Sequence, residues 1–229
     1  MAKYIINNSV KLIVCDMAGT TINEGGIVYN TLYQTIKNND IRIEKEEMKE
    51  WYGINKTQVL KHFLNRDQND NNNEILSELL DEFKHNLITN YRNDRMIRLI
   101  DPKLPELFNS FRENNIKIAL NSGFSVDIQK LLIKSLKMDQ FIDGYVSSEE
   151  VPHGRPEPYM IQHLMKKFDI NDPKQVIKLG DSVNDILEGI NSNCLDSIGV
   201  LSGAENKENL VKAGASQILN SVMDLRLSE

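Results

Sequence analysis

Short apolar runs that alternate with helical segments constrain the fold of this chain more than any other feature. Beyond Pro102, runs rich in β-branched residues are separated by segments of about ten residues with helical apolar periodicity. Such runs are typical of strands buried on both faces, and their alternation with helices predicts βαβ units with right-handed crossovers. The sequence therefore predicts a parallel sheet covered by helices, with strands at 116–120, 144–146, 176–179 and 198–201.

One further apolar run lies near the start of the chain, and it ends at an aspartate. Residues 10–15 form this run, and Asp16 follows directly. In an open α/β sheet, ligands bind at the carboxyl ends of the strands, which is where we expect Asp16 to lie. The small residues Ala18 and Gly19, followed by Thr20, allow backbone amides to approach an anion closely. Taken alone, the stretch is equally consistent with a strand and a turn in which Asp16 is only a cap.

A long helical block separates this first run from the other strands. Residues 23–101 are polar with helical periodicity, including apolar residues at steps of four within 75–87. The asparagine-rich stretch 65–73 is expected to be a loop because of its composition, and Pro102 ends the block. We therefore expect an α/β, Rossmann-like core with an inserted all-helical cap over the strand ends. The core would comprise residues 1–22 and 102–229, and the cap residues 23–101.

The composition of the chain argues against nucleic-acid and membrane partners. The chain has 229 residues and 40% hydrophobic residues, enough for a full core, and its net charge of −6 argues against a nucleic-acid surface. Its two cysteines, Cys15 and Cys194, form no disulfide or metal spacing, which fits a reducing compartment. No apolar run approaches the roughly 20 residues that span a bilayer, and the start of the chain lacks a signal-peptide pattern. We expect a cytoplasmic monomer or homodimer without nucleic-acid or membrane partners.

Polar side chains follow several of the predicted strands, on what should be one rim of the sheet. Ser122 follows the strand at 116–120, Asp181 and Asp185 follow the strand at 176–179, and Arg155 lies in a later loop. Each of these residues alone has an ordinary structural explanation as a turn residue, a helix cap or a surface cation. Converging carboxylates with a hydroxyl and a cation, however, suit Mg²⁺ and a phosphoryl group.

This constellation predicts a division of roles among the residues. Asp16 is the candidate nucleophile, because a carboxylate can form an aspartyl-phosphate and so divide one difficult step into two. Ser122 and Arg155 would bind the equatorial oxygens of the phosphoryl group, where charge must be stabilised. Asp181 and Asp185 would supply hard oxygen ligands for Mg²⁺.

The chain resembles the haloacid dehalogenase superfamily along almost its full length, with four motifs in the expected order. The details resemble the branch of phosphonoacetaldehyde hydrolase (phosphonatase) and its relatives, because Ala18 stands where most members carry a general acid–base aspartate, and Arg155 replaces a lysine. The motifs are residues 16–21, Ser122, Arg155 and residues 180–185. The resemblance implies that Mg²⁺ is held by Asp16, the backbone carbonyl of Ala18, Asp181 and Asp185, and that Thr20, Ser122, Gly123 and Arg155 bind the substrate phosphoryl group.

The alanine at position 18 has a chemical consequence. A general acid typically contributes 10²–10⁴-fold to the rate, so Ala18 must be compensated or made unnecessary. Phosphonatase makes the acid unnecessary, because a cap lysine forms a Schiff base with the substrate aldehyde and the imine accepts electrons when the C–P bond breaks. Lys56, three residues after Gly53, has the matching spacing in this chain. The alternative is that Lys56 is a solvated lysine at the start of a helix.

These observations predict a Mg²⁺-dependent hydrolase that cleaves a small phosphorylated or phosphonate metabolite through Asp16. The first alternative is a phosphate-monoester phosphatase of the phosphoglycolate type, which Ala18 disfavours. A dehalogenase fits poorly, because Arg155 and the acidic fourth motif point to phosphate and a metal. An alternative of another class is a non-catalytic phosphate-binding module that lost turnover with its general acid.

Overall fold

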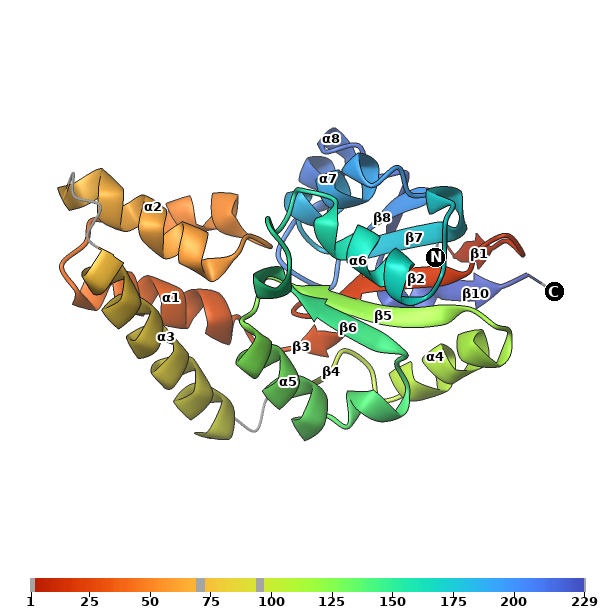
Figure 1. Cartoon of the computed structure of the whole chain (residues 1–229), viewed down its shortest axis with the longest axis horizontal. Coiled ribbons are helices and arrows are strands. Elements are labelled where there is room, and N and C mark those ends of the chain that lie inside the picture. Colours follow the sequence, from red (N-terminus) through yellow and green to blue (C-terminus); the bar gives the residue numbers. More distant parts are fainter. Residues whose placement is uncertain (1–2, 69–72, 94–96, 229) are drawn as a thin grey trace.

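The computed structural model describes residues 3–68, 73–93 and 97–228, and its centre is a parallel sheet (Figure 1). In the described part of the chain this sheet has six strands in the order β6-β5-β2-β7-β8-β9. The α/β fold with a parallel sheet is thus confirmed. The strands are β2 (Leu12–Asp16), β5 (Lys117–Ser122), β6 (Gly144–Ser147), β7 (Val176–Gly180), β8 (Asp196–Val200) and β9 (Gln217–Leu219).

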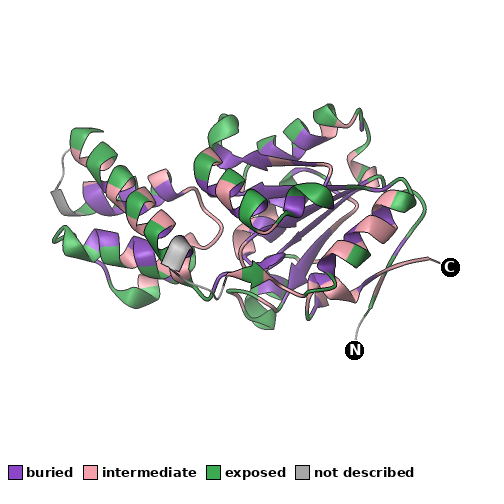
Figure 2. Cartoon of the chain, turned by 90° about the horizontal axis from the view of Figure 1, so that it is seen from below, coloured by how far each residue is buried: buried purple, intermediate pink, exposed green. Residues whose placement is uncertain are grey.

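Helices cover both faces of the sheet. Strand β2 is buried on both sides, since Ile13 and Cys15 pack into one apolar cluster while Leu12 and Val14 pack into another. Figure 2 shows this burial throughout the central strands, with exposed residues on the outer faces of the helices. Helices α4 (Leu104–Glu113) and α5 (Val126–Ser135) cover one face, and α6 (Tyr159–Lys167), α7 (Val183–Asn191) and the short α8 (Lys207–Lys212) cover the other.

The residues between β2 and α4 form a separate helical lobe (Figure 1). Helix α2 runs further than expected, because Arg66 pairs with Glu47 at 2.6 Å and lies over the ring of Phe63, which stabilises the last turn. The loop expected at 65–73 is therefore wrong for residues 65–68, and also for Asn73, which begins the next helix. Residues 69–72 lie outside the described residues. None of the helices described is long and apolar enough to cross a membrane. The lobe contains α1 (Ile27–Asn38), the 3₁₀ helix η1 (Lys45–Trp51), α2 (Lys56–Gln68) and α3 (Asn73–Asn93).

A short strand pair joins the lobe to the core. Strand β3 (Ile22–Asn23) pairs antiparallel with β4 (Arg98–Leu99), so the two connections between core and lobe lie side by side. The expectation of an all-helical insert is wrong at these ends, because two-residue strands leave no apolar alternation in the sequence. The pair supports the domain boundaries that we propose near residues 22 and 102. A second unpredicted pair, between β1 (Tyr4–Ile6) and β10 (Leu225–Leu227), joins the two ends of the described chain.

Candidate active site

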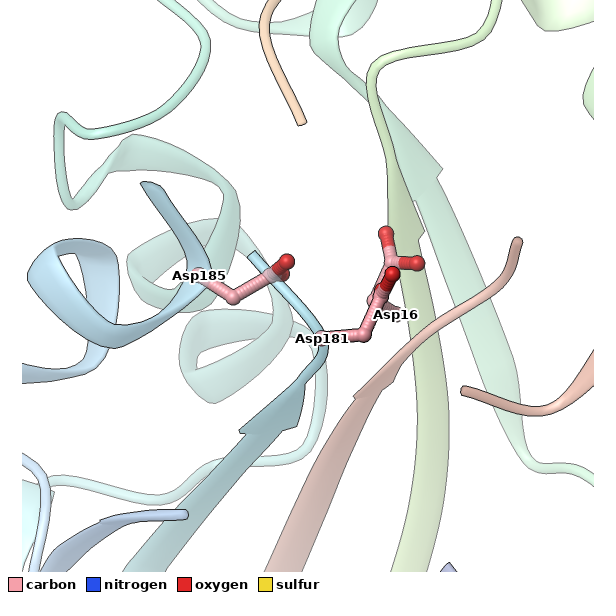
Figure 3. A group of neighbouring side chains, drawn as sticks. All are labelled: Asp16, Asp181 and Asp185. Carbon is pink, nitrogen blue, oxygen red and sulfur yellow. The ribbon is translucent and has the colours of Figure 1, made fainter. Parts of the chain in front are cut away.

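Three neighbouring strands deliver the polar side chains of the site. Strand β2 lies between β5 and β7, so Asp16 at the end of β2, Ser122 at the end of β5 and Asp181 after β7 meet at one edge. Asp185 lies in the first turn of α7. Figure 3 shows the carboxylates of Asp16, Asp181 and Asp185 around a common space; all three residues are buried, and each has an oxygen within 4.8 Å of the others.

The three carboxylates fit a divalent cation. Asp181 is held in place by the Thr20 hydroxyl, which donates to Oδ1 at 3.2 Å, and by the Ala204 amide, which donates to Oδ2 at 2.7 Å. Burial and the neighbouring carboxylates of Asp16 and Asp185 raise the pKa of Asp181 well above its usual value. A bound cation would relieve this repulsion, and hard carboxylate oxygens are the ligands that Mg²⁺ prefers. The donor set of this chain therefore matches the metal that the sequence predicts.

The candidate nucleophile faces a guanidinium group. Arg155 Nη1 lies 2.7 Å from Asp16 Oδ1, and both side chains are buried. Burial raises the pKa of Asp16 to about 6, although the attraction of Arg155 opposes this rise. Ser122 and Gly123 line the same cavity as Asp16. The structure thus brings Ser122, Gly123 and Arg155 to the cavity beside Asp16, while their roles remain predictions. Thr20, also expected to bind the phosphoryl group, is fully buried and does not line the cavity, because its hydroxyl donates to Asp181.

A cavity of about 330 Å³ extends from these residues to the helical lobe. Lys56 begins α2, but its side chain is buried, with only 7% of its surface exposed, so it is not a solvated lysine. Its Nζ donates to the Ile54 carbonyl at 2.8 Å and to the Tyr29 hydroxyl at 3.3 Å. The cavity is lined by residues of both parts of the chain, among them Asp16, Ala18, Glu24, Tyr29, Tyr52, Lys56, Phe124, Arg155 and Asp181.

The environment of Lys56 changes its protonation. Burial lowers the pKa of Lys56 to about 8, because an ammonium ion loses hydration there. The Asp16 carboxylate opposes this shift, and the Arg155 guanidinium reinforces it. An amine with this pKa is about one-tenth neutral at pH 7, far more than an ordinary lysine.

The loop that precedes Lys56 is seated on the core. The side-chain amide of Asn184 donates to the Tyr52 carbonyl at 2.8 Å, and that of Asn55 donates to Ser148 Oγ at 2.8 Å. Gly53 has a φ of 77°, and a Cβ atom there would lie 2.5 Å from Ser182 Oγ. This position therefore requires glycine both for its backbone conformation and for the close approach to the loop that carries Asp181.

Gly53→Ala tests this contact. The substitution adds roughly 1–2 kcal/mol of left-handed backbone strain and a clash with Ser182, so the loop should lift from the core and carry Lys56 with it. We expect turnover to fall at least tenfold while the melting temperature of the core changes by only a few degrees. Gly25→Ala is the matched control, because Gly25 also has positive φ but no atom lies within 4 Å of its added Cβ. Equal losses in the two variants would contradict the contact.

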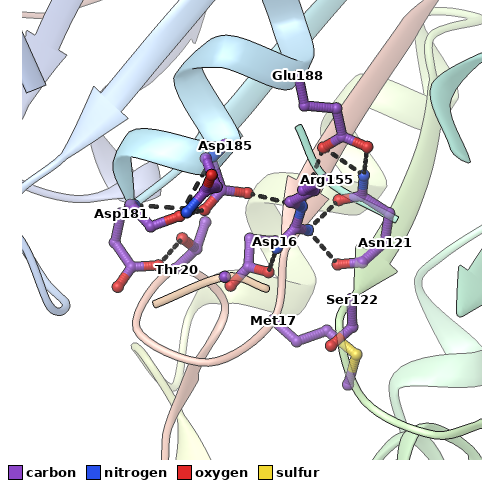
Figure 4. A network of polar contacts seen from close by, with 12 residues as sticks. Asp16, Met17, Thr20, Asn121, Ser122, Arg155, Asp181, Asp185 and Glu188 are labelled. Carbon is purple, nitrogen blue, oxygen red and sulfur yellow. Dashed lines mark hydrogen bonds and ion pairs between the residues drawn. The ribbon is translucent and has the colours of Figure 1, made fainter. Parts of the chain in front are cut away.

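Three further buried polar residues lie behind the site, and the sequence analysis did not identify them. Asn121 and Glu188 form hydrogen bonds with each other and with Arg155 (Figure 4). Lys178 donates to Asn121 and pairs with Glu188. The sequence did contain an indication of the role of Lys178, because this lysine interrupts a strand that is expected to be buried on both faces. A lysine in such a strand must be paired, because an isolated buried charge is very unfavourable.

The chain belongs to the haloacid dehalogenase-like hydrolase family, whose model matches residues 10–193. This confirms the superfamily resemblance stated above. The chain is therefore a hydrolase, and the alternative of a non-catalytic module is not supported. Members of this family generally use Mg²⁺, in agreement with the buried aspartate cluster.

Three proteins of similar sequence or structure show what this chain resembles. A phosphonoacetaldehyde hydrolase of Parabacteroides distasonis is 24% identical over 93% of this chain and 93% of its own length. The crystal structure of a phosphonoacetaldehyde hydrolase-like protein from Oleispira antarctica superposes with a TM-score of 0.80 at 20% identity, over 98% of this chain and 92% of that chain. A predicted phosphoglycolate phosphatase from Haemophilus somnus superposes with a TM-score of 0.71 at 18% identity, covering 93% of this chain and 95% of that chain. At these identities the structural likeness shows the fold alone.

Asp181→Ala tests the metal site. Loss of this carboxylate should lower Mg²⁺ affinity by at least tenfold and turnover with it, because a bound cation neutralises charge that develops on the phosphoryl group. Isothermal titration with Mg²⁺ measures the first effect without reference to activity. Asp139→Asn, an exposed aspartate of the core, serves as the control. Full wild-type activity after complete chelation would contradict a metal role for the whole cluster.

Proposed function

We propose that this hydrolase cleaves a small phosphorus-containing metabolite with Mg²⁺, through an aspartyl-phosphate on Asp16. The support is the arrangement of Asp16 between the carboxylates of Asp181 and Asp185 and the guanidinium of Arg155. The metal, held by Asp16, Asp181 and Asp185, would supply charge neutralisation at the phosphoryl oxygens. Arg155 would orient the phosphoryl group for in-line attack, and Ser122 would donate to one of its oxygens.

We further propose phosphonoacetaldehyde as the substrate, on the basis of one observation. The buried amine of Lys56 lines the same cavity as Asp16, while Ala18 leaves the usual place of the general acid empty of any titratable group. An amine in this position can replace the acid by changing the leaving group. The names of the curated relatives agree with this choice of substrate.

The proposed chemistry balances as follows. The neutral Lys56 amine attacks the aldehyde carbon, the adduct takes up one proton from solvent, and water leaves to give a protonated imine; the proton is returned when water later releases the product from Lys56. A carboxylate oxygen of Asp16 attacks phosphorus, the C–P bond breaks, and its electron pair moves into the imine to give an enamine. The enamine takes a proton at carbon, and water releases acetaldehyde from Lys56. A second water hydrolyses the aspartyl-phosphate and regenerates the carboxylate.

A phosphate-monoester phosphatase is the second candidate, and one buried carboxyl group favours it. Glu24 lines the cavity, and burial raises its pKa although the Val28 amide donates to Oε2 at 2.9 Å. A protonated Glu24 would be a source of the proton that an ester leaving group needs and that Ala18 does not supply. Under this candidate Lys56 would bind the leaving group by charge alone.

A substrate panel separates the two candidates. The purified protein is assayed with phosphonoacetaldehyde, phosphoglycolate and an aryl phosphate, with and without Mg²⁺, and borohydride is added to the phosphonoacetaldehyde reaction. We expect Mg²⁺-dependent release of phosphate and acetaldehyde, and a reduced two-carbon adduct on Lys56 in the peptide map. Turnover of esters with no adduct and no C–P cleavage would instead establish the phosphatase.

A further inference from the structure

Arg155 is held on two of its three nitrogens by groups behind the site (Figure 4). Its Nε donates to Glu188 Oε2 at 3.0 Å and lies 3.2 Å from Asp185 Oδ1. Its Nη2 donates to the Asn121 backbone carbonyl at 2.9 Å and to the Asn121 side-chain oxygen at 2.7 Å. Nη1 alone extends to Asp16. The plane of the guanidinium is therefore fixed, with one nitrogen directed at the candidate nucleophile.

The side chain of Asn121 has its own fixed orientation. Its Oδ1 accepts from both Arg155 and Lys178, at 2.7 and 2.9 Å. Its Nδ2 donates to the two carboxylate oxygens of Glu188 at 2.8 and 2.9 Å. A flipped amide would turn its NH₂ group toward two cations and its oxygen toward a carboxylate. Only the observed orientation satisfies all of these groups.

Lys178 completes this arrangement although it is fully buried, with 0% of its surface exposed. Its Nζ donates to Asn121 Oδ1, to the Leu179 carbonyl at 3.1 Å and to Asp185 Oδ1 at 2.6 Å, so its three hydrogens all have acceptors. Buried ion pairs of this kind contribute little net stability compared with well-packed apolar side chains. Stability alone is therefore a weak reason for placing the charges of Lys178 and Glu188 behind the site.

We propose that Glu188 and Asn121, with Lys178 behind them, are positioning residues that set the direction in which Arg155 meets the phosphoryl group. The proposal rests on the phosphate-binding role proposed for Arg155. Without the carboxylate of Glu188, Arg155 Nε loses the nearer of its two anionic partners and keeps only Asp185, while Asn121 loses the acceptor that fixes its amide. The guanidinium would then rotate, and Nη1 would no longer keep its direction toward Asp16.

A double-mutant cycle with inorganic phosphate as the probe tests the proposal. The Kd of orthophosphate is measured calorimetrically with saturating Mg²⁺ for the wild type, Glu188→Gln, Arg155→Lys and the double variant. We expect each single change to weaken binding at least tenfold. The double variant should bind no more than about twofold more weakly than the worse single variant, because both changes remove the same oriented contact. Ile186→Val, a conservative change of a buried residue in the same helix, is the control and should leave the Kd unchanged.

The outcomes of the cycle distinguish the phosphate-binding role of Arg155 from the positioning role of its neighbours. If Arg155→Lys binds orthophosphate like the wild type, the role proposed for Arg155 fails. If Arg155→Lys weakens binding but Glu188→Gln does not, or if the two losses multiply, the positioning role fails alone. Should Glu188→Gln not fold, Asn121→Ala replaces it in the same cycle, since it leaves every charge in place. Wild-type affinity in folded Asn121→Ala would likewise overturn the positioning role.

Discussion

Replacing Asp16 by asparagine should abolish turnover while leaving the fold intact. Asparagine has nearly the same size and can still accept the hydrogen bond from Arg155, but its amide cannot attack phosphorus. We expect kcat to fall on the order of 10⁴-fold or more, as for other catalytic nucleophiles. The melting temperature should be unchanged or higher, because one of three mutually repelling carboxylates loses its charge. Phosphate release and thermal denaturation measure the two effects.

Beryllium fluoride provides an independent measurement of the same residue. As an analogue of the phosphoryl group, it should bind to the carboxylate of Asp16 in the wild type and not to the asparagine variant. Asp139→Asn, on the exposed surface of the core, should behave as the wild type in both assays. Substantial turnover by folded Asp16→Asn would end its assignment as the nucleophile.

Lys56→Arg should lose C–P cleavage almost completely, by about 10³-fold or more, because a guanidinium keeps the charge but cannot form an imine at neutral pH. The substitution separates the two roles considered for this residue. Loss of C–P cleavage together with loss of the borohydride adduct would support the imine. Undiminished turnover of the true substrate by Lys56→Arg would contradict the imine and favour a substrate whose leaving group is already acidic.

The pH dependence of adduct formation gives a further check on Lys56. Its pKa is lowered to about 8, so the reactive neutral amine increases about tenfold per pH unit below that value and levels off above it. The initial rate of borohydride trapping should follow the same curve. Lys61, an exposed lysine of the same helix, is the internal reference for labelling outside the cavity. Identical profiles for the two lysines would contradict a depressed pKa.

The central fold could be predicted because burial leaves a clear pattern in the sequence. Strand β2 and its neighbours are continuous apolar runs, and α4 to α7 carry apolar residues at helical spacing. The pairs β3–β4 and β1–β10 could not be predicted, since each strand has only two or three residues and its pairing depends on distant segments. The extension of α2 into an asparagine-rich stretch depends likewise on the contact between Arg66 and Glu47, which lie far apart in the sequence.

The residues of the site likewise fall into those that could be predicted from the sequence and those that could not. Asp16, Ser122 and Asp181 could be predicted to converge, because each follows a strand and parallel strands end at one edge. Asn121 and Glu188 could not, because a buried polar residue looks like a surface residue until its partners are known. The burial of Lys56 depends on how the loop before it docks on the core, and sequence spacing does not encode that docking.

The two groups that we propose to react reach the cavity from independent parts of the chain: Asp16 from the sheet and Lys56 from the helical insert between β3 and β4. Because that insert enters and leaves through one short strand pair, its replacement would leave the strands of the sheet unchanged. A different insert could bring an acid, a hydroxyl or no reactive group at all to the same phosphoryl site. A change of leaving-group chemistry would thus require replacement of one contiguous segment, with Asp16, Asp181 and Asp185 left untouched.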